Sequence, residues 1–171
     1  MGTGGLFLRK LRAKVADEPT GFVWVEKGKL AGSGYPASKA QVQWLARSGI
    51  RSILSLTVDP IPVQWIEGLD IVAGHIAMED HQAPSVESMV RAVDFVVEQA
   101  AAGRSVLVHC LAGEGRTGCV LSAYLIRTRN LSADEAMATL RQLKPGFVEW
   151  RQERAVRDFE ERSSERQKTQ I

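Results

Sequence analysis

Apolar and polar positions along the chain alternate with the spacing of strands or helices over most of its length. Phe22 to Val25 alternates and is followed by turn signals at Lys27-Gly28 and Gly32-Ser33-Gly34, which predicts a short hairpin. Residues Ser38 to Arg47 place apolar side chains at helical spacing, and Gly49 follows as a helix stop. This part of the chain therefore predicts a hairpin followed by a helix.

The middle of the chain combines apolar runs with one long helical pattern. Ile50 to Thr57 indicates a buried strand, and a second apolar stretch from Leu69 to Met78 ends in the polar segment Glu79-Asp80-His81-Gln82. Pro84-Ser85 opens a helical pattern that continues to Ala102, with Ser85 as the expected N-cap. Ser105 to His109 contains Val-Leu-Val, which is typical of a sheet strand covered on both faces.

Helical patterns fill the last third of the chain. Gly118 to Thr128 predicts one helix, and Leu131 to Leu143 predicts another, opened by the capping box Ser132-Ala133-Asp134-Glu135. Lys144-Pro145-Gly146 breaks the pattern, and Glu149 to Arg162 predicts a final amphipathic helix. Strands that alternate with helices predict the α/β class: a central, mostly parallel sheet flanked by helices, with binding groups in loops at the carboxyl ends of the strands.

Composition and charge narrow the class of protein. A length of 171 residues with 44% hydrophobic and 25% charged residues fits one folded globular domain. Lys and Arg number 22 against 20 Asp and Glu, and this surplus of +2 is too small for a nucleic-acid partner. The two cysteines, Cys110 and Cys119, do not form a secreted disulfide framework, so a reducing, cytoplasmic location is expected.

The ends of the chain differ in composition from its middle. Leu6 to Val15 interleaves apolar residues with cations, so it could lie on an anionic membrane or form a terminal helix that packs on the domain. We expect residues 1–20 to be a basic extension or helix, 21–163 the folded domain that carries the function and 164–171 a polar tail. No apolar run approaches the roughly 18 to 20 residues of a spanning helix, so stable membrane insertion is not expected. We expect the protein to be a monomer.

The segment from His109 to Gly118 carries the candidate chemistry. Gly113 to Gly118 matches the G-x-G-x-x-G pattern of dinucleotide-binding loops, after a strand and before a helix. A dinucleotide fold also requires a second strand that ends in an acid, whereas the chain after Arg127 turns and re-enters a helix at Ser132. This disfavours a dinucleotide cofactor, and Cys110 alone would be interpreted as a small core residue.

The same segment is better interpreted as a cradle for one phosphate group. Its variable residues, substrate-binding in this interpretation, are Leu111, Ala112, Gly113, Glu114 and Gly115. Glycines let the backbone curl so that successive amides and the following helix N-terminus face an anion. This field favours a reactive thiolate at Cys110, and the planar guanidinium of Arg116 can bind two phosphoryl oxygens and oppose their charge during transfer.

The pattern His109-Cys110-x-x-Gly113-x-x-Arg116-Thr117 resembles the signature of the cysteine-dependent protein tyrosine phosphatase superfamily. From about Gly21 to Arg162 the chain is similar to the small atypical dual-specificity phosphatases, the minimal single-domain kind also found in archaea. The segments that share this similarity are Leu30-Ala31-Gly32, Ser55-Leu56-Thr57, Lys144-Pro145-Gly146 and Gln152-Glu153-Arg154-Ala155-Val156. The resemblance implies a protein tyrosine phosphatase-like fold with the phosphate-binding loop between a strand and a helix.

The resemblance also implies catalytic roles. Cys110 attacks phosphorus and forms a cysteinyl-phosphate, while Arg116 and the loop amides hold the transferring group. An Asp upstream of the signature protonates the leaving oxygen; Asp80, followed by Pro84-Ser85, fits this place, and Glu79 is the alternative.

Further roles follow from the same resemblance. Thr117 corresponds to a hydroxyl that hydrogen-bonds the cysteine sulfur, and His109 orders the loop from behind. Either Gln152 or Glu149 occupies the place of the residue that positions the attacking water. No cofactor and no metal are expected. Cys119 is expected in the core, with a regulatory disulfide to Cys110 as the minor alternative.

The loop composition bears on the substrate. Leu111, Ala112 and Glu114 provide no cation for extra phosphates, and an acid beside the pocket disfavours a highly charged head group. The expected activity is hydrolysis of phosphotyrosine, with phosphoserine and phosphothreonine, in phosphorylated proteins or peptides. The alternatives are a phosphatase for phosphoinositides or other small phosphomonoesters, a catalytically weak phosphoprotein-binding module, and a sulfurtransferase.

Overall fold

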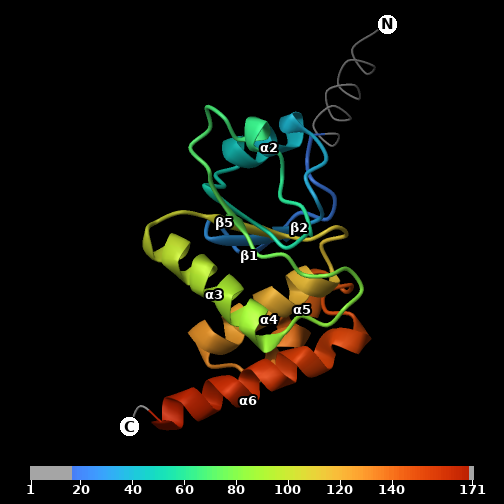
Figure 1. The fold of residues 1–171 in the computed structure, drawn as a ribbon, viewed down its shortest axis with the longest axis vertical. Coiled ribbons are helices and arrows are strands. Elements are labelled where there is room, and N and C mark those ends of the chain that lie inside the picture. The colour runs from blue at the N-terminus through green and yellow to red at the C-terminus, as the bar shows by residue number, and fades with distance from the viewer. Residues whose placement is uncertain (1–16, 170–171) are drawn as a thin grey trace, which may run out of the picture.

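The computed structural model describes residues 17–169 and builds them around one five-stranded sheet (Figure 1). The strand order is β1-β2-β5-β3-β4, where β1 is Val23–Glu26, β2 Leu30–Ser33, β5 Val106–His109, β3 Ser52–Ser55 and β4 Val72–His75. β1 pairs antiparallel with β2, and every other neighbouring pair is parallel. The mostly parallel α/β sheet predicted from the sequence is confirmed. The basic stretch Leu6 to Val15 lies outside the described residues.

Helices cover both faces of the sheet unequally (Figure 1). On one side lie α2 and the short 3₁₀ helix η1, and on the other side lie α3, α4, α5 and α6. Their bounds are Lys39–Arg47 for α2, Val63–Trp65 for η1, Val86–Ala101 for α3, Gly115–Arg129 for α4, Ala133–Leu143 for α5, Trp150–Gln152 for the 3₁₀ helix η2 and Glu153–Thr169 for α6. Within the described residues, no helix combines the length and the apolar character that crossing a bilayer requires.

The central strand β5 contributes to a hydrophobic core on each face. Val106 and Val108 pack in the larger core under α3, α4, α5 and α6, whereas Leu107 packs in the smaller core under α2. Successive side chains of a strand point to opposite faces, so a run of apolar residues is buried on both. This explains why Val-Leu-Val predicts a covered strand, and it places the end of β5 in the middle of the molecule.

The predicted helix caps form as the sequence indicates. Ser85 begins α3 and accepts a hydrogen bond from the Ser88 amide at 3.1 Å. Ser132 accepts from the Glu135 amide, and the Glu135 carboxylate accepts from the Ser132 amide at 2.8 Å, which is the reciprocal capping box at the start of α5. Both sites satisfy backbone amides that a helix start leaves without a partner.

Several boundaries differ from the sequence-based prediction. The strand predicted over Ile50 to Thr57 is shorter, Ser52–Ser55, and the apolar stretch Leu69 to Met78 forms a strand over Val72–His75. Gly32 lies within β2 rather than in a turn, where it pairs with Val23 of β1 and Val108 of β5. A Cβ at this position would come within 3.0 Å of Leu121, so the glycine serves the close approach of α4 rather than a turn. The helix predicted from Gly118 begins at Gly115, since the Gly118 amide already donates to the Glu114 carbonyl. The last helix begins at Glu153, after the turn of η2, and continues to Thr169.

The sheet register gathers polar residues at one edge. Ser33, Ser55 and His109 end the neighbouring strands β2, β3 and β5 and are paired across the sheet. The carboxyl ends of parallel strands are where open α/β sheets form binding sites. The loop between His109 and Gly115 therefore starts at this edge.

Candidate active site

The loop between β5 and α4 curls around the Cys110 thiol. Cys110 is buried, with only 2% of its surface exposed, and its Sγ accepts a hydrogen bond from the Gly113 amide at 3.2 Å. Gly113 adopts a positive φ of 73°, and a Cβ at this position would lie 2.2 Å from the Ser33 carbonyl carbon. Only glycine fits here, because the loop is both left-handed and pressed against the end of β2.

His109 supports the loop from the core side. Its Nδ1 lies 3.3 Å from the Cys110 carbonyl oxygen and its Nε2 lies 2.8 Å from Ser55 Oγ. A carbonyl only accepts, so Nδ1 carries the proton and Nε2 accepts from the Ser55 hydroxyl. Burial lowers the pKa of His109 to about 4, and the nearby charge of Arg116 acts in the same direction. The imidazole is therefore neutral at physiological pH.

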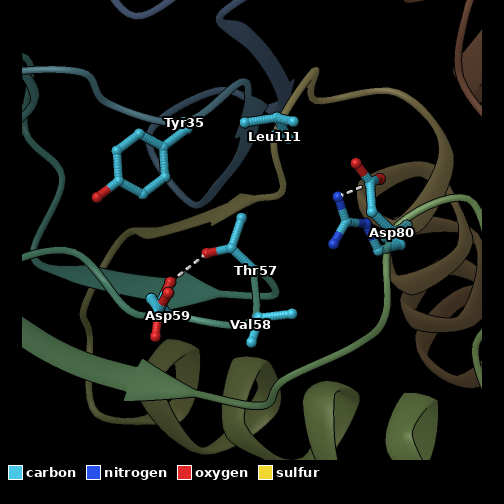
Figure 2. A pocket seen from close by; sticks show the side chains of 7 residues that line it. Tyr35, Thr57, Val58, Asp59, Asp80 and Leu111 are labelled. Atoms are coloured by element: carbon cyan, nitrogen blue, oxygen red, sulfur yellow. Dashed lines mark hydrogen bonds and ion pairs between the residues drawn. The ribbon is translucent and has the colours of Figure 1, made fainter.

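Arg116 lies in the first turn of α4 and its side chain is almost fully buried. One guanidinium nitrogen donates to the Met78 carbonyl at 2.9 Å, and another donates to Asp80 Oδ1 at 2.5 Å (Figure 2). Asp80 belongs to the segment that we call the acid loop (residues 79–84), and Met78 lies just before this loop, after β4. The structure thus brings together Arg116 and Asp80, which the sequence assigns to separate roles.

A cavity of about 340 Å³ opens beside this pair. Figure 2 shows Asp80 on one side of the cavity and Tyr35, Leu111 and Val58 across from it. The full lining is Tyr35, Thr57, Val58, Asp59, Asp80, Leu111 and Arg116. One end of the cavity is therefore charged, and the opposite wall presents an aromatic ring and aliphatic side chains.

The cavity separates the two candidate acids. Asp80 lines it together with Arg116, whereas the exposed Glu79 lines a neighbouring cavity with Ala77 and Ser88. Of the two carboxylates, Asp80 is thus the one placed beside the buried cation.

Sequence reasoning missed several residues of the cavity wall. Tyr35, Thr57, Val58 and Asp59 follow β2 and β3, the two strands that flank β5. Tyr35 is fixed by its amide, which donates to the Leu111 carbonyl at 3.0 Å, and its ring meets the His109 ring edge to face. The rule that binding groups follow the carboxyl ends of neighbouring strands would have singled out these positions.

Glu114 is directed away from the cavity lining by a contact with the turn before η2. Its carboxylate lies 3.8 Å from Lys144 Nζ, and a Cβ on Gly146 would come within 2.8 Å of the Glu114 carboxyl carbon. Lys144 Nζ also donates to the Gly113 carbonyl at 2.9 Å. Lys144 therefore both opposes the charge of Glu114 and holds the backbone of the loop between β5 and α4 (residues 110–114, the predicted phosphate loop), a role that the sequence did not suggest.

Thr117 is buried directly after Arg116. Its Oγ1 has no hydrogen-bond partner within the described part of the chain, so the expected bond to the Cys110 sulfur is not formed in this structure. Ala112 lies exposed in the loop.

Gln152 and Cys119 meet behind the loop. Gln152 is buried, Cys119 Sγ donates to its Oε1 at 3.9 Å, and Glu149 is exposed. Burial strongly raises the pKa of the Cys119 thiol, and both cysteines are free. Gln152 does not line the cavity that contains Arg116 and Asp80.

Comparison with known proteins gives consistent matches to phosphatases. Residues 19–157 match the model of the family described as "PTP-SAK: Swiss Army Knife protein, DSP-PTPase phosphatase domain". The chain is 37% identical over 102 residues to the dual specificity protein phosphatase Mpk3 of Drosophila melanogaster, which covers 59% of this chain and 25% of that protein.

Two further relatives extend the comparison. The chain is 28% identical over 112 residues to the phosphatidylglycerophosphate phosphatase PTPMT1 of Arabidopsis thaliana, which covers 65% of this chain and 33% of that protein. A crystal structure of Tk-PTP in a mutant form superimposes with a TM-score of 0.77 at 31% identity, covering 84% of this chain and 96% of the other. The chain thus spans a quarter to a third of the length of the Drosophila and Arabidopsis phosphatases.

Proposed function

Because the chain belongs to the DSP-PTPase phosphatase domain family, we propose that it hydrolyses phosphorylated tyrosine, serine and threonine side chains of proteins without a metal ion. One observation carries the proposal: Arg116 and Asp80 line one cavity, and Arg116 follows the loop that encloses the Cys110 thiol. These three groups supply a nucleophile, a cation for the phosphoryl oxygens and a proton donor.

The first chemical step transfers the phosphoryl group to the enzyme. Cys110 Sγ attacks phosphorus as the bond from phosphorus to the ester oxygen breaks, and Asp80 gives its proton to the departing oxygen. Arg116 and the loop amides hold the three equatorial oxygens, whose charge spreads during transfer. The products are a cysteinyl-phosphate and a neutral alcohol or phenol.

The second step returns the enzyme to its starting state. Water attacks phosphorus, the Asp80 carboxylate takes a proton from this water, and the sulfur–phosphorus bond breaks to release phosphate. The buried Thr117 hydroxyl, which has no partner among the described residues, is available to donate to the departing Cys110 sulfur. This availability supports the role that the family resemblance implies for Thr117.

The walls of the cavity favour a phosphorylated side chain as the substrate. Tyr35, Val58 and Leu111 offer apolar contact to the group that carries the phosphate. Glu114, although paired with Lys144, adds no positive charge that would neutralise a second phosphate. The similarity to a phosphatidylglycerophosphate phosphatase supports a second candidate, a phosphatase for phospholipids or other small phosphomonoesters.

Phosphate release from three substrates tests the proposal. Purified protein in EDTA is given a phosphotyrosine peptide, a phosphothreonine peptide and vesicles that contain phosphatidylglycerophosphate. We expect release from the peptides to be abolished by Cys110→Ser and slowed about a hundredfold by Asp80→Ala, the size typical of general-acid catalysis. Glu79→Ala is the matched control and should retain activity.

Three outcomes would contradict this assignment. Peptide binding without release makes the chain a binding module, preferential release from the vesicles makes it a lipid phosphatase, and equal losses in Glu79→Ala and Asp80→Ala remove the special role of Asp80.

A further inference from the structure

Gln152 connects three parts of the site that are distant in sequence. Its Nε2 donates to the Gln82 carbonyl of the acid loop at 3.0 Å. Its Oε1 faces the start of α4, where a Cβ on Gly115 would lie 2.3 Å away and where Cys119 Sγ donates to it. With 2% of its surface exposed, this amide is packed on every side.

The acid loop has little other support. Residues 79–83 are exposed and lie outside helices and strands. Before the loop, the Met78 amide donates to the Leu56 carbonyl at 3.0 Å and the Met78 carbonyl accepts from Arg116. After Asp80, the His81 amide donates to Asp80 Oδ1 at 3.0 Å, a bond within the loop itself, and the bond from Gln152 to the Gln82 carbonyl ties the loop backbone to the rest of the domain.

A strained residue lies between these two anchors. His81 has a positive φ of 58°, a conformation that costs a non-glycine residue free energy and persists where its surroundings hold it. The bonds at Met78 and Gln82 hold the backbone on both sides of Asp80, while Arg116 binds the Asp80 carboxylate itself. When a substrate takes up the guanidinium, the two backbone anchors are what keep Asp80 beside the cavity.

We propose that Gln152 is a positioning residue for the general acid: it clasps the acid loop to the start of α4 and so fixes Asp80 beside the cavity. The amide nitrogen is already bound to Gln82, the amide oxygen faces Gly115 and Cys119, and the side chain does not line the cavity. This arrangement favours the clasp over the orientation of the attacking water. The inference rests on the proposed function, in which Asp80 protonates the leaving oxygen.

The clasp predicts a dependence on the leaving group. A displaced acid slows the cleavage of esters whose oxygen needs a proton and leaves activated esters nearly unaffected. Gln152→Met has a similar shape but no donor, and we expect it to lower kcat/KM for phenyl phosphate about tenfold or more, and for 2,4-dinitrophenyl phosphate less than about twofold. Gln152→Glu, which also cannot donate when ionised, should behave alike. Gln142→Met, at an exposed glutamine of α5, is the matched control and should leave both values unchanged.

A double variant and hydrogen exchange separate the clasp from other roles. In an Asp80→Asn background, Gln152→Met should cause no further loss in kcat/KM, because the two changes remove one function. Amide exchange over residues 79–83 should become faster in Gln152→Met, an effect that is measured without turnover.

Each alternative result has a defined meaning. A burst of phenol, with a lower kcat and an unchanged kcat/KM, would assign Gln152 to the attack of water. An equal loss in kcat/KM for every leaving group would assign it a purely structural role. Either result overturns the proposed positioning role. Unchanged exchange in the acid loop overturns it as well. An inactive wild type refutes the proposed function, and faster exchange in its Gln152→Met variant would still establish the clasp.

Discussion

We expect acidification to destabilise this protein in part through its buried imidazole, that of His109. Folding holds its pKa at about 4, against an ordinary value of 6.5, chiefly because burial penalises the charged ring. Between these two values the unfolded chain binds a proton that the folded chain does not. The contribution of His109 to the free energy of unfolding is therefore fully present above about pH 6.5 and is lost as the pH falls towards 4.

The size of the effect follows from the difference between the two pKa values. At about 1.4 kcal/mol for each pH unit, His109 accounts for a loss of about 3 kcal/mol in the free energy of unfolding across this range. Its bonds to Ser55 and to the Cys110 carbonyl fix the neutral tautomer, so protonation on Nε2 also removes the acceptor that the Ser55 hydroxyl uses.

Urea unfolding at a series of pH values tests this reasoning. Carboxylates also titrate near pH 4, so the informative quantity is the difference between the wild type and His109→Gln, in which only the imidazole is absent. We expect this difference to shrink by about 3 kcal/mol from pH 7 to pH 4. Two results would refute the burial argument: a stability difference between the wild type and His109→Gln that stays constant with pH, or a His109 imidazole nitrogen NMR signal that titrates near pH 6.5 in the folded protein.

Two further substitutions test the phosphate loop. Gly113→Ala should lower the free energy of unfolding by more than about 3 kcal/mol and abolish activity, because the new Cβ meets the backbone of Ser33. Gly28 has the same φ of 73° but open space around it, so Gly28→Ala should lower the free energy of unfolding by only about 1 kcal/mol. Equal losses in urea unfolding would contradict the packing argument. Lys144→Met should weaken inhibition by inorganic phosphate about fivefold, because it leaves the Gly113 carbonyl without its donor and the Glu114 charge unopposed. Adding Glu114→Gln to this variant should restore part of the inhibition. Unchanged inhibition in Lys144→Met would show that Lys144 does not affect the cavity.

Local patterns predicted the sheet and most helices because they depend on neighbours in the sequence. The capping box at Ser132 and the apolar run before His109 each specify a structure within a few residues. The boundaries that differed depend on tertiary contacts: Gly32 is in a strand because it pairs with β1 and β5, and η2 precedes α6 where Gln152 reaches the acid loop.

The candidate site divides in the same way. Cys110, Gly113 and Arg116 lie in one short segment, so their spacing alone indicates the phosphate cradle. The contacts of Lys144 with the loop and of Gln152 with Gln82 join residues that are 31 and 70 positions apart. Nothing in the local sequence encodes such pairs, and they became visible only with the fold.

The ion pair between Arg116 and Asp80 places opposite charges side by side at one end of the cavity. An anion that binds the guanidinium therefore competes with a carboxylate that is already bound to it. The chain thus carries its own competitor, which lowers the affinity for substrate and for released phosphate by the same factor. Such a competitor weighs most against a monatomic anion such as chloride and least against a phosphoryl group, which can bind two guanidinium nitrogens at once.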